Sequence, residues 1–210
     1  MSEYYVPFEA GETEFTEKRS RFLGHIRRVG TEAEARAFVD AMRKKYYDAR
    51  HNCWCFALHD GGVVRYGDDG EPQGTAGQPM LNVFRREGVE NVVCVVTRYF
   101  GGVLLGAGGL TRAYARSAKD ALDAAGKAKM RLWFAMTADC PYPMLERLRL
   151  LAAAHGGREE STDFGEMAGV HLLLPQENVE AFAAALSELS AGRLALRGDG
   201  ERFLPGGREG

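Results

Sequence analysis

Apolar and polar positions in the first 130 residues follow helical and strand spacing in turn. Thr31 and Glu34 form a capping box, in which a hydroxyl and a carboxylate each accept a hydrogen bond from a backbone N–H group at a helix start. Gly61 and Gly62 supply the positive φ values that a tight hairpin turn requires. The spacing predicts strands over residues 21–29, 52–58, 63–67 and 91–100, and helices over residues 31–46 and 110–126.

Two glycine-rich segments interrupt this pattern. The run at residues 91–100 is almost continuously apolar and β-branched, which is typical of a central strand covered on both faces, and it leads into the glycine-rich residues 101–109. Residues 68–79, DDGEPQGTAGQP, form a polar loop that is long for a mere connection. We expect Thr75 to cap a short helix that follows this loop.

The pattern changes after Lys127, where a second domain begins. The order strand, helix, strand, strand, helix, strand predicts a ferredoxin-like sandwich, with two helices on one face of a four-stranded antiparallel sheet. The chain is therefore assigned to the α+β class. The expected strands are residues 132–141, 158–165, 167–175 and 193–204, and the expected helices are residues 142–155 and 177–190. The expected domains are residues 1–130 and 131–204, followed by a disordered tail at residues 205–210.

Composition narrows the class of protein. With 45% hydrophobic and 27% charged residues, the chain is too apolar to be intrinsically disordered. No apolar run approaches the roughly 18 residues of a membrane span, and the acidic start is unlike a secretory signal. We therefore expect a cytoplasmic protein without a membrane partner. The four cysteines lie in apolar runs without disulfide or zinc spacing, which favours buried free thiols.

Charge is distributed unevenly along the chain. Residues 1–130 hold 19 basic and 17 acidic side chains, whereas residues 131–210 hold 8 and 12, so the net charges are +2 and −4. The basic residues of the first part form clusters, and these suggest either a local anion-binding face or an ordinary solvated surface. The clusters are Lys18, Arg19 and Arg21; Arg27 and Arg28; and Arg43, Lys44 and Lys45.

The glycine-rich segment at residues 101–109 allows two interpretations. It ends at a helix start, where free N–H groups favour an anion, and Arg112 lies one turn into that helix. However, it contains neither a P-loop nor a complete dinucleotide fingerprint. Glycine is also needed wherever two backbones pack closely, so tight packing is the alternative explanation.

Asp68, Asp69 and Glu71 place three carboxylates within four residues of the polar loop. Such a cluster suits Mg²⁺ binding or acid–base chemistry, with His51 as a general base. The alternative is that these acids accept hydrogen bonds from nearby N–H groups of the turn. No other metal or cofactor is indicated.

Two polar pairs lie at the ends of predicted strands. Arg50 and His51 precede one strand, and Arg98 and Tyr99 end another. Such side chains beside glycine-rich loops suggest a contact surface for a phosphate, a nucleotide or RNA. For His51, a hydrogen-bonded structural role is an equal alternative.

Four motifs in their order along the chain resemble the IMPACT family, in particular its bacterial YigZ-like members with a UPF0029-type N-terminal domain. They are RHNCWCF (50–56), DDGEPQGTAGQP (68–79), VVCVVTRYFGG (92–102) and LLGAGGLTRAY (104–114). Residues 132–204 also resemble the small C-terminal domain of the bacterial members. The resemblance implies a left-handed βαβ fold like domain IV of elongation factor G for residues 1–130, and a relative of its ferredoxin-like domain V thereafter.

The resemblance also implies a role and a site. Eukaryotic family members act in translational control under amino-acid starvation, a stress response, through an added partner-binding domain that this chain has no room for. Many family members carry Lys where this chain has Leu104, so a phosphate contact made by that lysine would be missing here. The characteristic positions of the family correspond to Arg50, His51, Asn52, Asp68, Asp69, Glu71, Arg98, Tyr99, Gly101, Gly102, Gly106, Gly108, Gly109 and Arg112.

These observations lead to one main hypothesis. The chain is expected to be a non-enzymatic module that binds RNA or the ribosome and regulates translation. Arg50, Arg98 and Arg112 would contact phosphates, the loop at residues 101–109 would shape the site, and the acidic loop would orient the arginines. The sheet of the second domain is a candidate surface for a protein partner.

Two alternatives remain open at this point. A small metal-assisted hydrolase or phosphoryl-handling enzyme would need the three carboxylates, His51 and the glycine loop to converge in one pocket. A purely structural interpretation has the DDGEP and YFGG loops packing only on each other.

Overall fold

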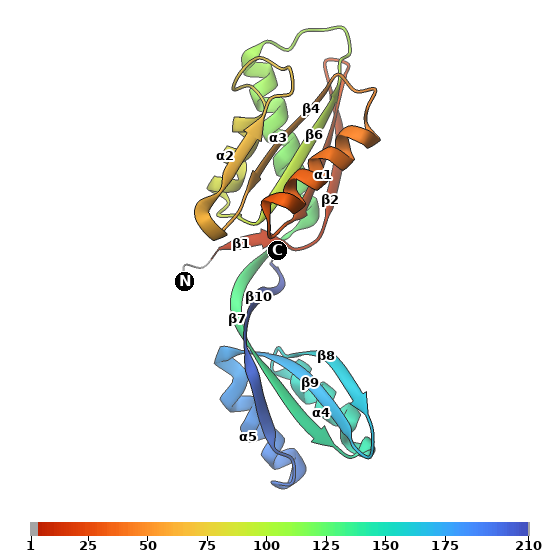
Figure 1. Ribbon diagram of the computed structural model, residues 1–210, viewed down its shortest axis with the longest axis vertical. Helices are drawn as coiled ribbons and strands as arrows, with labels where there is room; N and C mark the ends of the chain where they lie inside the picture. The colour runs from red at the N-terminus through yellow and green to blue at the C-terminus, as the bar shows by residue number, and fades with distance from the viewer. Residues whose placement is uncertain (1–3, 210) are drawn as a thin grey trace. The chain divides into compact units, whose positions relative to one another are not determined.

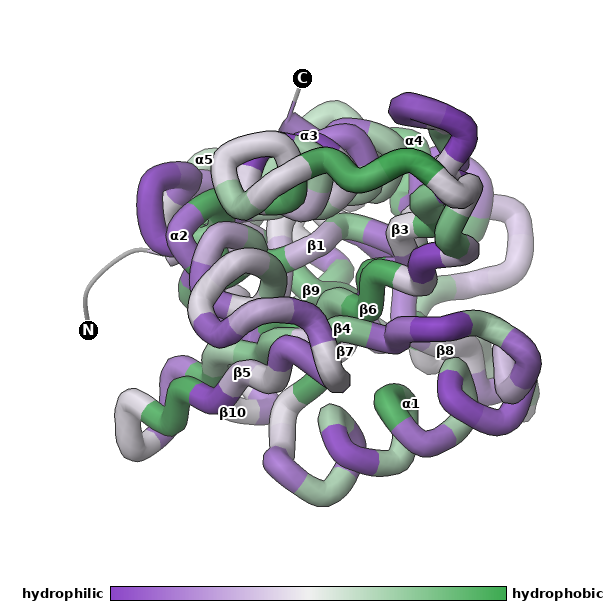
Figure 2. Tube along the Cα trace, turned by 90° about the horizontal axis from the view of Figure 1, so that it is seen from above, coloured by the Kyte–Doolittle hydropathy of each residue, from purple (hydrophilic) through white to green (hydrophobic). Residues whose placement is uncertain are grey.

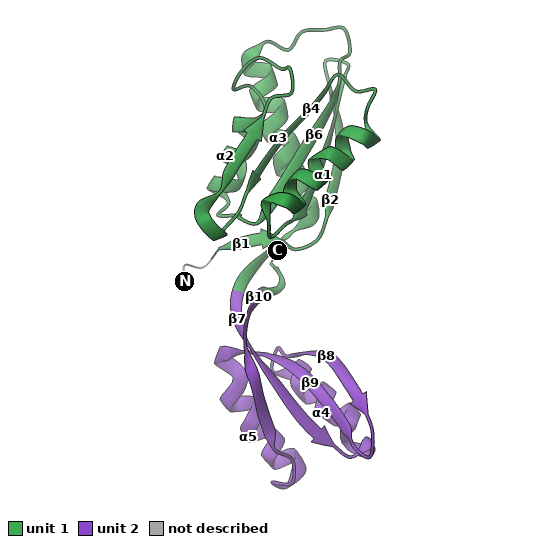
Figure 3. Cartoon of the chain, in the orientation of Figure 1, with its two compact units in different colours: residues 1–130, 205–210 green, residues 131–204 purple. Residues whose placement is uncertain are grey.

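The computed structural model describes residues 4–209 and divides the chain into two units, shown in Figure 3. The N-terminal unit runs to Met130 and also includes the chain from Pro205 onward, whereas the C-terminal unit comprises Arg131–Leu204. Residues 205–209 belong to strand β10 (Leu196–Glu209), so the expectation of a disordered tail is wrong for them, and Gly210 lies outside the described residues. Arg208 anchors this segment by donating to the Ala124 carbonyl and to Glu9, each at 3.3 Å.

The N-terminal unit is built on a five-stranded sheet of order β2-β3-β6-β4-β5, in which all neighbours are antiparallel (Figure 1). Because β3 and β4 both pair with β6, they run parallel to each other, and α1 (Glu32–Lys45) connects them. The central position expected for the run at residues 91–100 is confirmed. The strands are β2 (Gly11–Glu17), β3 (Ser20–Arg28), β4 (His51–Ala57), β5 (Val64–Gly67) and β6 (Val92–Tyr99).

Helices cover both faces of this sheet. Val93 and Val95 of β6 pack in a cluster with α1, whereas Cys94 and Val96 join a cluster with α2 (Gly77–Arg86) and α3 (Ala107–Ala125). Successive strand residues point to opposite faces, so a nearly continuous apolar strand serves both layers. Figure 2 shows α1 and the α2–α3 layer on opposite sides of β4 and β6.

Local signals placed most of these elements correctly. The Thr31 hydroxyl accepts a hydrogen bond from the N–H of Glu34 at 3.2 Å, as the capping box predicts, whereas the Glu34 carboxylate accepts one from Gly30, the residue before the cap, at 2.7 Å. Gly61 and Gly62 have φ values of 70° and 60° in the β4–β5 connection. Two N-terminal strands were not predicted: β2, and β1 (Tyr5–Pro7), which pairs with β7 (Lys127–Cys140).

The C-terminal unit is a ferredoxin-like sandwich, as predicted. Its strands lie in the order β10-β7-β9-β8, which in the unit's own numbering is 4-1-3-2. Leu148 and Phe182, one from each helix, pack on Val170 and Leu172 of the central strand. The remaining elements are α4 (Leu145–Ala154), β8 (Arg158–Phe164), β9 (Ala168–Pro175) and α5 (Val179–Ser190).

The thiols of all four cysteines are free and buried, as expected. Burial raises the pKa of the Cys53 and Cys94 thiols well above its usual value, so both stay protonated. None of the helices in residues 4–209 is long and apolar enough to cross a bilayer.

His25 gives the N-terminal unit a predictable pH dependence. Its side chain is 3% exposed on β3 and stacks on Tyr46. Nδ1 lies 3.5 Å from Glu12 Oε1, and neither ring nitrogen has a hydrogen-bond partner of good geometry within residues 4–209. Burial lowers the pKa of His25, and Lys45 lowers it further, whereas Glu12 raises it. The unfolded chain, with a pKa of about 6.5, therefore binds the proton more readily, and the protein loses stability as the pH falls below that value.

We expect His25→Phe to reduce the loss of stability between pH 7 and pH 5. Phenylalanine retains the ring stacking on Tyr46 and removes the group that must remain uncharged when the protein is folded. Urea unfolding of both proteins at several pH values measures the effect. Equal slopes of unfolding free energy against pH in the two proteins would contradict the prediction.

Candidate functional site

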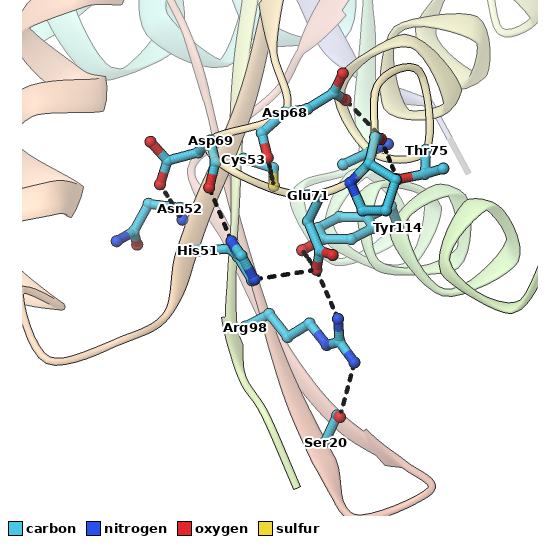
Figure 4. A network of polar contacts seen from close by, with 12 residues as sticks. Ser20, His51, Asn52, Cys53, Asp68, Asp69, Glu71, Thr75, Arg98 and Tyr114 are labelled. Atoms are coloured by element: carbon cyan, nitrogen blue, oxygen red, sulfur yellow. Dashed lines mark hydrogen bonds and ion pairs between the residues drawn. The ribbon is translucent and has the colours of Figure 1, made fainter. Parts of the chain in front are cut away.

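The register of the sheet brings the predicted site residues to one end of the N-terminal unit. His51, the first residue of β4, pairs directly with Arg98 near the end of β6. The acidic loop lies between β5 and α2, and the glycine-rich loop lies between β6 and α3. Figure 4 shows the acidic loop against the side chains of this sheet end, and Gly106 of the glycine-rich loop lines a cavity with His51 and Arg98.

Arg98 forms a buried ion pair with Glu71. Its Nη1 donates to Glu71 Oε1 at 2.7 Å, and its Nη2 donates to the Ser20 hydroxyl at 3.1 Å. Tyr114 of α3 donates to the same Glu71 oxygen at 2.8 Å. Arg98 is 4% exposed and Glu71 9% exposed, so the expectation that Arg98 contacts phosphate is not met. The apolar surroundings explain this, because a buried guanidinium needs a nearby carboxylate.

The phenol of Tyr114 acts as a permanent donor in this network. Burial, followed by the nearby Cys53 thiol and Glu71 carboxylate, raises the pKa of Tyr114 far above its usual value. The hydroxyl therefore keeps its proton and helps to hold the Glu71 carboxylate in place. Sequence reasoning missed both Ser20 and Tyr114 as members of the site.

His51 is held in one tautomer by the acidic loop. Its Nδ1 lies 2.8 Å from the carbonyl oxygen of Asp69, and because a carbonyl only accepts, Nδ1 carries a proton. Nε2 lies 3.9 Å from Glu71 Oε1. Gly70 has a φ of 84°, and a Cβ there would lie 3.4 Å from Nδ1. The loop is therefore wrapped closely around the imidazole ring.

Asp68 caps the following helix. Its carboxylate accepts hydrogen bonds from the backbone N–H groups of Gly74 at 2.7 Å, Ala76 at 3.1 Å and Gly77 at 2.8 Å. Thr75, which was expected to cap this helix, instead donates its hydroxyl to the Pro72 carbonyl at 2.6 Å. The expectation for Thr75 is wrong because the loop folds back and brings an acid, a stronger acceptor, to the helix start.

The three acids of the loop serve three separate sets of partners. Asp69 accepts hydrogen bonds from Arg43 at 2.9 Å and from the N–H of Asn52 at 2.7 Å, whereas Asp68 caps α2 and Glu71 holds Arg98. In residues 4–209, no three histidine, cysteine, aspartate or glutamate side chains are grouped to hold a metal ion. The interpretation as hydrogen-bond acceptors therefore describes this loop. Of the groups that the metal-assisted hydrolase would bring together, His51, Glu71 and Gly106 line one cavity, whereas Asp68 and Asp69 do not line it.

The glycines of residues 101–109 serve both packing and conformation. A Cβ on Gly101 would overlap the carbonyl group of Arg19, so the β2–β3 turn packs directly on this glycine. Gly102 and Gly106 have φ values of 83° and 73°, which side chains disfavour. The remaining two glycines lie in the first turn of α3. A Cβ added at Gly108 would lie 3.5 Å from Arg112 Nη1, and one added at Gly109 would lie 3.0 Å from Leu105 Cβ.

Tyr99 does not join Arg98. Adjacent strand residues face opposite sides of a sheet, and the Tyr99 hydroxyl donates to Asp48, just beyond α1, at 2.8 Å. Partial burial and then the hydrogen bond to Asp48 raise the pKa of Tyr99. Tyr99 therefore belongs to the α1 face of the sheet, and only Arg98 faces the predicted site.

Two cavities flank the start of α3. The first, here called the His51 cavity, has a volume of about 330 Å³ and its charged and polar lining consists of Arg50, His51, Glu71 and Arg98. The second, here called the Arg112 pocket, has a volume of about 240 Å³ and is lined by Phe15, Glu17, Lys18, Leu105, Gly109, Arg112, Ala113 and Arg116. Leu105 lines both, so the two cavities are neighbours on either side of one side chain.

Exposed cations surround these cavities, and we call them the cationic rim. Within the described part of the chain, Lys18, Arg19, Arg50 and Arg112 form no ion pair, and Arg50 lies over the Phe100 ring at 5.9 Å. The rim is completed by Arg116, which lies over Phe15 at 4.3 Å and pairs with Asp120 at 3.3 Å. Lys18 was predicted only as part of a basic cluster that suggests an anion-binding face. Arg116 was not predicted, although it follows Arg112 by one helical turn and so shares its face.

Both units match known families. Residues 18–122 match a family model described as the Impact N-terminal domain, and residues 139–193 match a domain of unknown function, DUF1949. IMPACT family member YvyE of Bacillus subtilis is 33% identical over 94% of this chain and 91% of its own length. YigZ of Escherichia coli is 35% identical over 85% of this chain and 89% of its own. A solved chain, described as a hypothetical protein, has a TM-score of 0.60 and 32% identity, covering 93% of this chain and 97% of its own.

The buried ion pair can be tested by single and double substitution. Glu71→Leu leaves the Arg98 charge buried without its carboxylate, and we expect it to lower the free energy of unfolding by about 3–5 kcal/mol. Adding Arg98→Met removes the unpaired charge, so the double variant should recover most of that loss. Urea unfolding measures both effects. Arg21→Ala, which breaks the exposed pair with Glu14, is the control and should change stability little.

The capping role of Asp68 leads to a separate prediction. Asp68→Ala removes the acceptor for three backbone N–H groups, and we expect a loss of about 2 kcal/mol in unfolding free energy. Asp68→Asn keeps one side-chain oxygen as an acceptor and should lose less. The same urea titration compares the variants, and an Asp68→Ala protein as stable as the wild type would rule out the capping role.

Proposed function

The chain belongs to the IMPACT family, and from this premise we propose that it is a regulator of translation that binds RNA, on the ribosome or free, through its cationic rim. The family assignment supplies the link to translation. The rim supplies a surface of the right charge, because proteins bind nucleic acid mainly through Lys and Arg contacts to phosphates.

The conformation of the β2–β3 turn is the observation that carries this proposal. Lys18 and Arg19 have φ values of 45° and 67°, so two consecutive basic residues occupy the left-handed region that glycine and asparagine prefer. Such residues cost stability, and they are found where the surrounding structure or a function requires them. Here the strained turn presents two exposed cations beside Gly101 and the Arg112 pocket.

The start of α3 adds to the positive potential of the rim. Gly106 is the residue before the helix and offers no side-chain cap, and the first turn carries no acid. The free N–H groups and the helix dipole therefore favour an anion near Arg112. A phosphate in the Arg112 pocket would meet Lys18, Arg112 and Arg116 from two different elements.

Leu104 leaves a gap in this rim. Its side chain is 81% exposed and lines the His51 cavity, at the position where many family members have lysine. A lysine here would reach solvent next to Arg50 without displacing buried groups. The rim of this chain is therefore one cation short of the common family pattern.

We expect Arg112→Ala to weaken RNA binding and Leu104→Lys to strengthen it. Each phosphate contact contributes about −0.7 to −0.9 to the slope of log K against log salt. The slope should therefore become less steep by about this amount in Arg112→Ala and steeper by about this amount in Leu104→Lys. Fluorescence anisotropy with a single-stranded RNA oligomer over a salt series measures both. Co-sedimentation with ribosomal subunits then identifies the form of RNA that is bound.

Arg147→Ala serves as the matched control. Arg147 is an exposed helical arginine of the C-terminal unit, and its loss changes the net charge equally but leaves the rim intact. Its affinity and salt slope should equal those of the wild type. Equal losses in the Arg112 and Arg147 variants, or no binding by the wild type at low salt, would refute the proposal.

A further inference from the structure

We propose that the His51 cavity receives one unpaired base of the RNA whose phosphates bind the cationic rim, with a preference for guanine. This inference rests on the proposed function and adds to it a means of recognising single-stranded RNA. It assigns a role to Phe100 and His51 that phosphate contacts alone do not require.

The size and lining of the His51 cavity suit a single flat ring system. Its volume of about 330 Å³ is at the lower end of the range for ligand pockets, about 300 to 1,000 Å³. Phe100, Leu105 and Leu110 supply apolar walls, and the few polar groups are those of Arg50, His51, Glu71 and Arg98. Apolar walls with a few convergent polar groups are typical of sites that bind an organic ring.

Phe100 provides a platform for stacking. Its side chain is 39% exposed, and the guanidinium groups of Arg50 and Arg98 lie 5.9 and 5.4 Å from its ring centre. Bases of single-stranded RNA stack on aromatic rings and on arginine planes, and every base offers a flat face for this contact. An exposed phenylalanine next to the 81% exposed Leu104 is costly in water, and a stacked base would cover both.

The polar lining of the cavity offers two acceptors, on His51 and Glu71, beside the guanidinium groups of Arg50 and Arg98. In the tautomer with its proton on Nδ1, the imidazole of His51 carries its lone pair on Nε2, which lies 3.9 Å from Glu71 Oε1. Arg98 and Tyr114 both donate to Oε1 of Glu71, while Oε2 accepts no hydrogen bond from residues 4–209. Two acceptors favour a base edge with adjacent donors, and guanine carries N1–H and the N2 amino group side by side. Uracil offers only one N–H on that edge.

The two cavities are arranged as the parts of a nucleotide require. Leu105 separates the His51 cavity from the Arg112 pocket, so a base in one places its phosphates close to the cations of the other. A base paired in a duplex cannot enter the cavity because its edge is occupied and its faces are stacked. The site should therefore select single strands.

The test uses three seven-nucleotide RNA oligomers that differ only at the central position. One carries guanine there, one uracil and one no base, and all other positions are abasic, so the number of phosphates is equal. We expect the full-length wild-type protein to bind the guanine oligomer roughly 5- to 150-fold more tightly than the abasic one, the range for one stacked base, with uracil between them. The salt slopes of the three should be the same, because the phosphate contacts are unchanged.

Substitutions assign the effect to the cavity. Phe100→Leu retains an apolar side chain but removes the stacking face, so it should reduce the advantage of the guanine and uracil oligomers over the abasic one and leave binding of the abasic oligomer unchanged. Phe164→Leu is the matched control, because Phe164 is an exposed phenylalanine of the C-terminal unit. Its preference should equal that of the wild type, and circular dichroism confirms that each variant is folded.

The outcomes separate this inference from the proposed function. Equal, salt-dependent binding of all three oligomers by the wild type would overturn the base site while RNA binding through the rim remained. An unchanged advantage of the guanine oligomer over the abasic one in Phe100→Leu would also overturn it. No binding of any oligomer at low salt would refute both proposals. The comparison of oligomers needs only the wild type, so the test does not depend on the folding of a variant.

Discussion

The buried ion pair between Arg98 and Glu71 is the constraint on which the end of the N-terminal unit depends. Removing two charges from water costs several kcal/mol per ion, and this cost is offset only when the pair has good geometry and further hydrogen bonds. Ser20 and Tyr114 supply those bonds from β3 and α3, so four elements are joined at one point. The pair therefore ties the acidic loop to the central strand. Without it, neither the position of His51 against that loop nor the wall of the cavity would be defined.

Local signals in the sequence predicted the fold well, whereas the partners of the site residues depended on contacts between distant segments. The capping box at Thr31 and the apolar run of β6 are both local patterns, and both were confirmed. Glu71 and Arg98 are 27 residues apart, and no local pattern pairs them. One signal was nevertheless present. Arg98 shares the period-2 face of Cys94 and Val96, so strand alternation alone places Arg98 and Tyr99 on opposite faces of the sheet.

The elements that the sequence did not reveal are also held by distant partners. Strand β2 has few apolar residues, and Gly11 fits there because a Cβ would overlap the Ala121 carbonyl of α3. The segment after Pro205 is rich in glycine and looks like a flexible tail, yet Arg208 bonds to Ala124. In both cases, composition alone suggests an irregular segment. The stabilising contact is made with a residue far away in the sequence, so no local pattern reveals it. Boundaries of this kind follow from packing and not from propensity.

Packing and ligand binding are not competing explanations of the glycine-rich loop. Gly101 is required because the Arg19 backbone lies against it, and that same contact holds the strained turn that presents Lys18 and Arg19. Close packing thus places cations that would otherwise avoid this conformation. Arg98, by contrast, is buried in an ion pair with Glu71 and lines the His51 cavity. The three arginines of the predicted site therefore differ in role. Arg98 is structural, whereas Arg50 and Arg112 are exposed and remain available for phosphate.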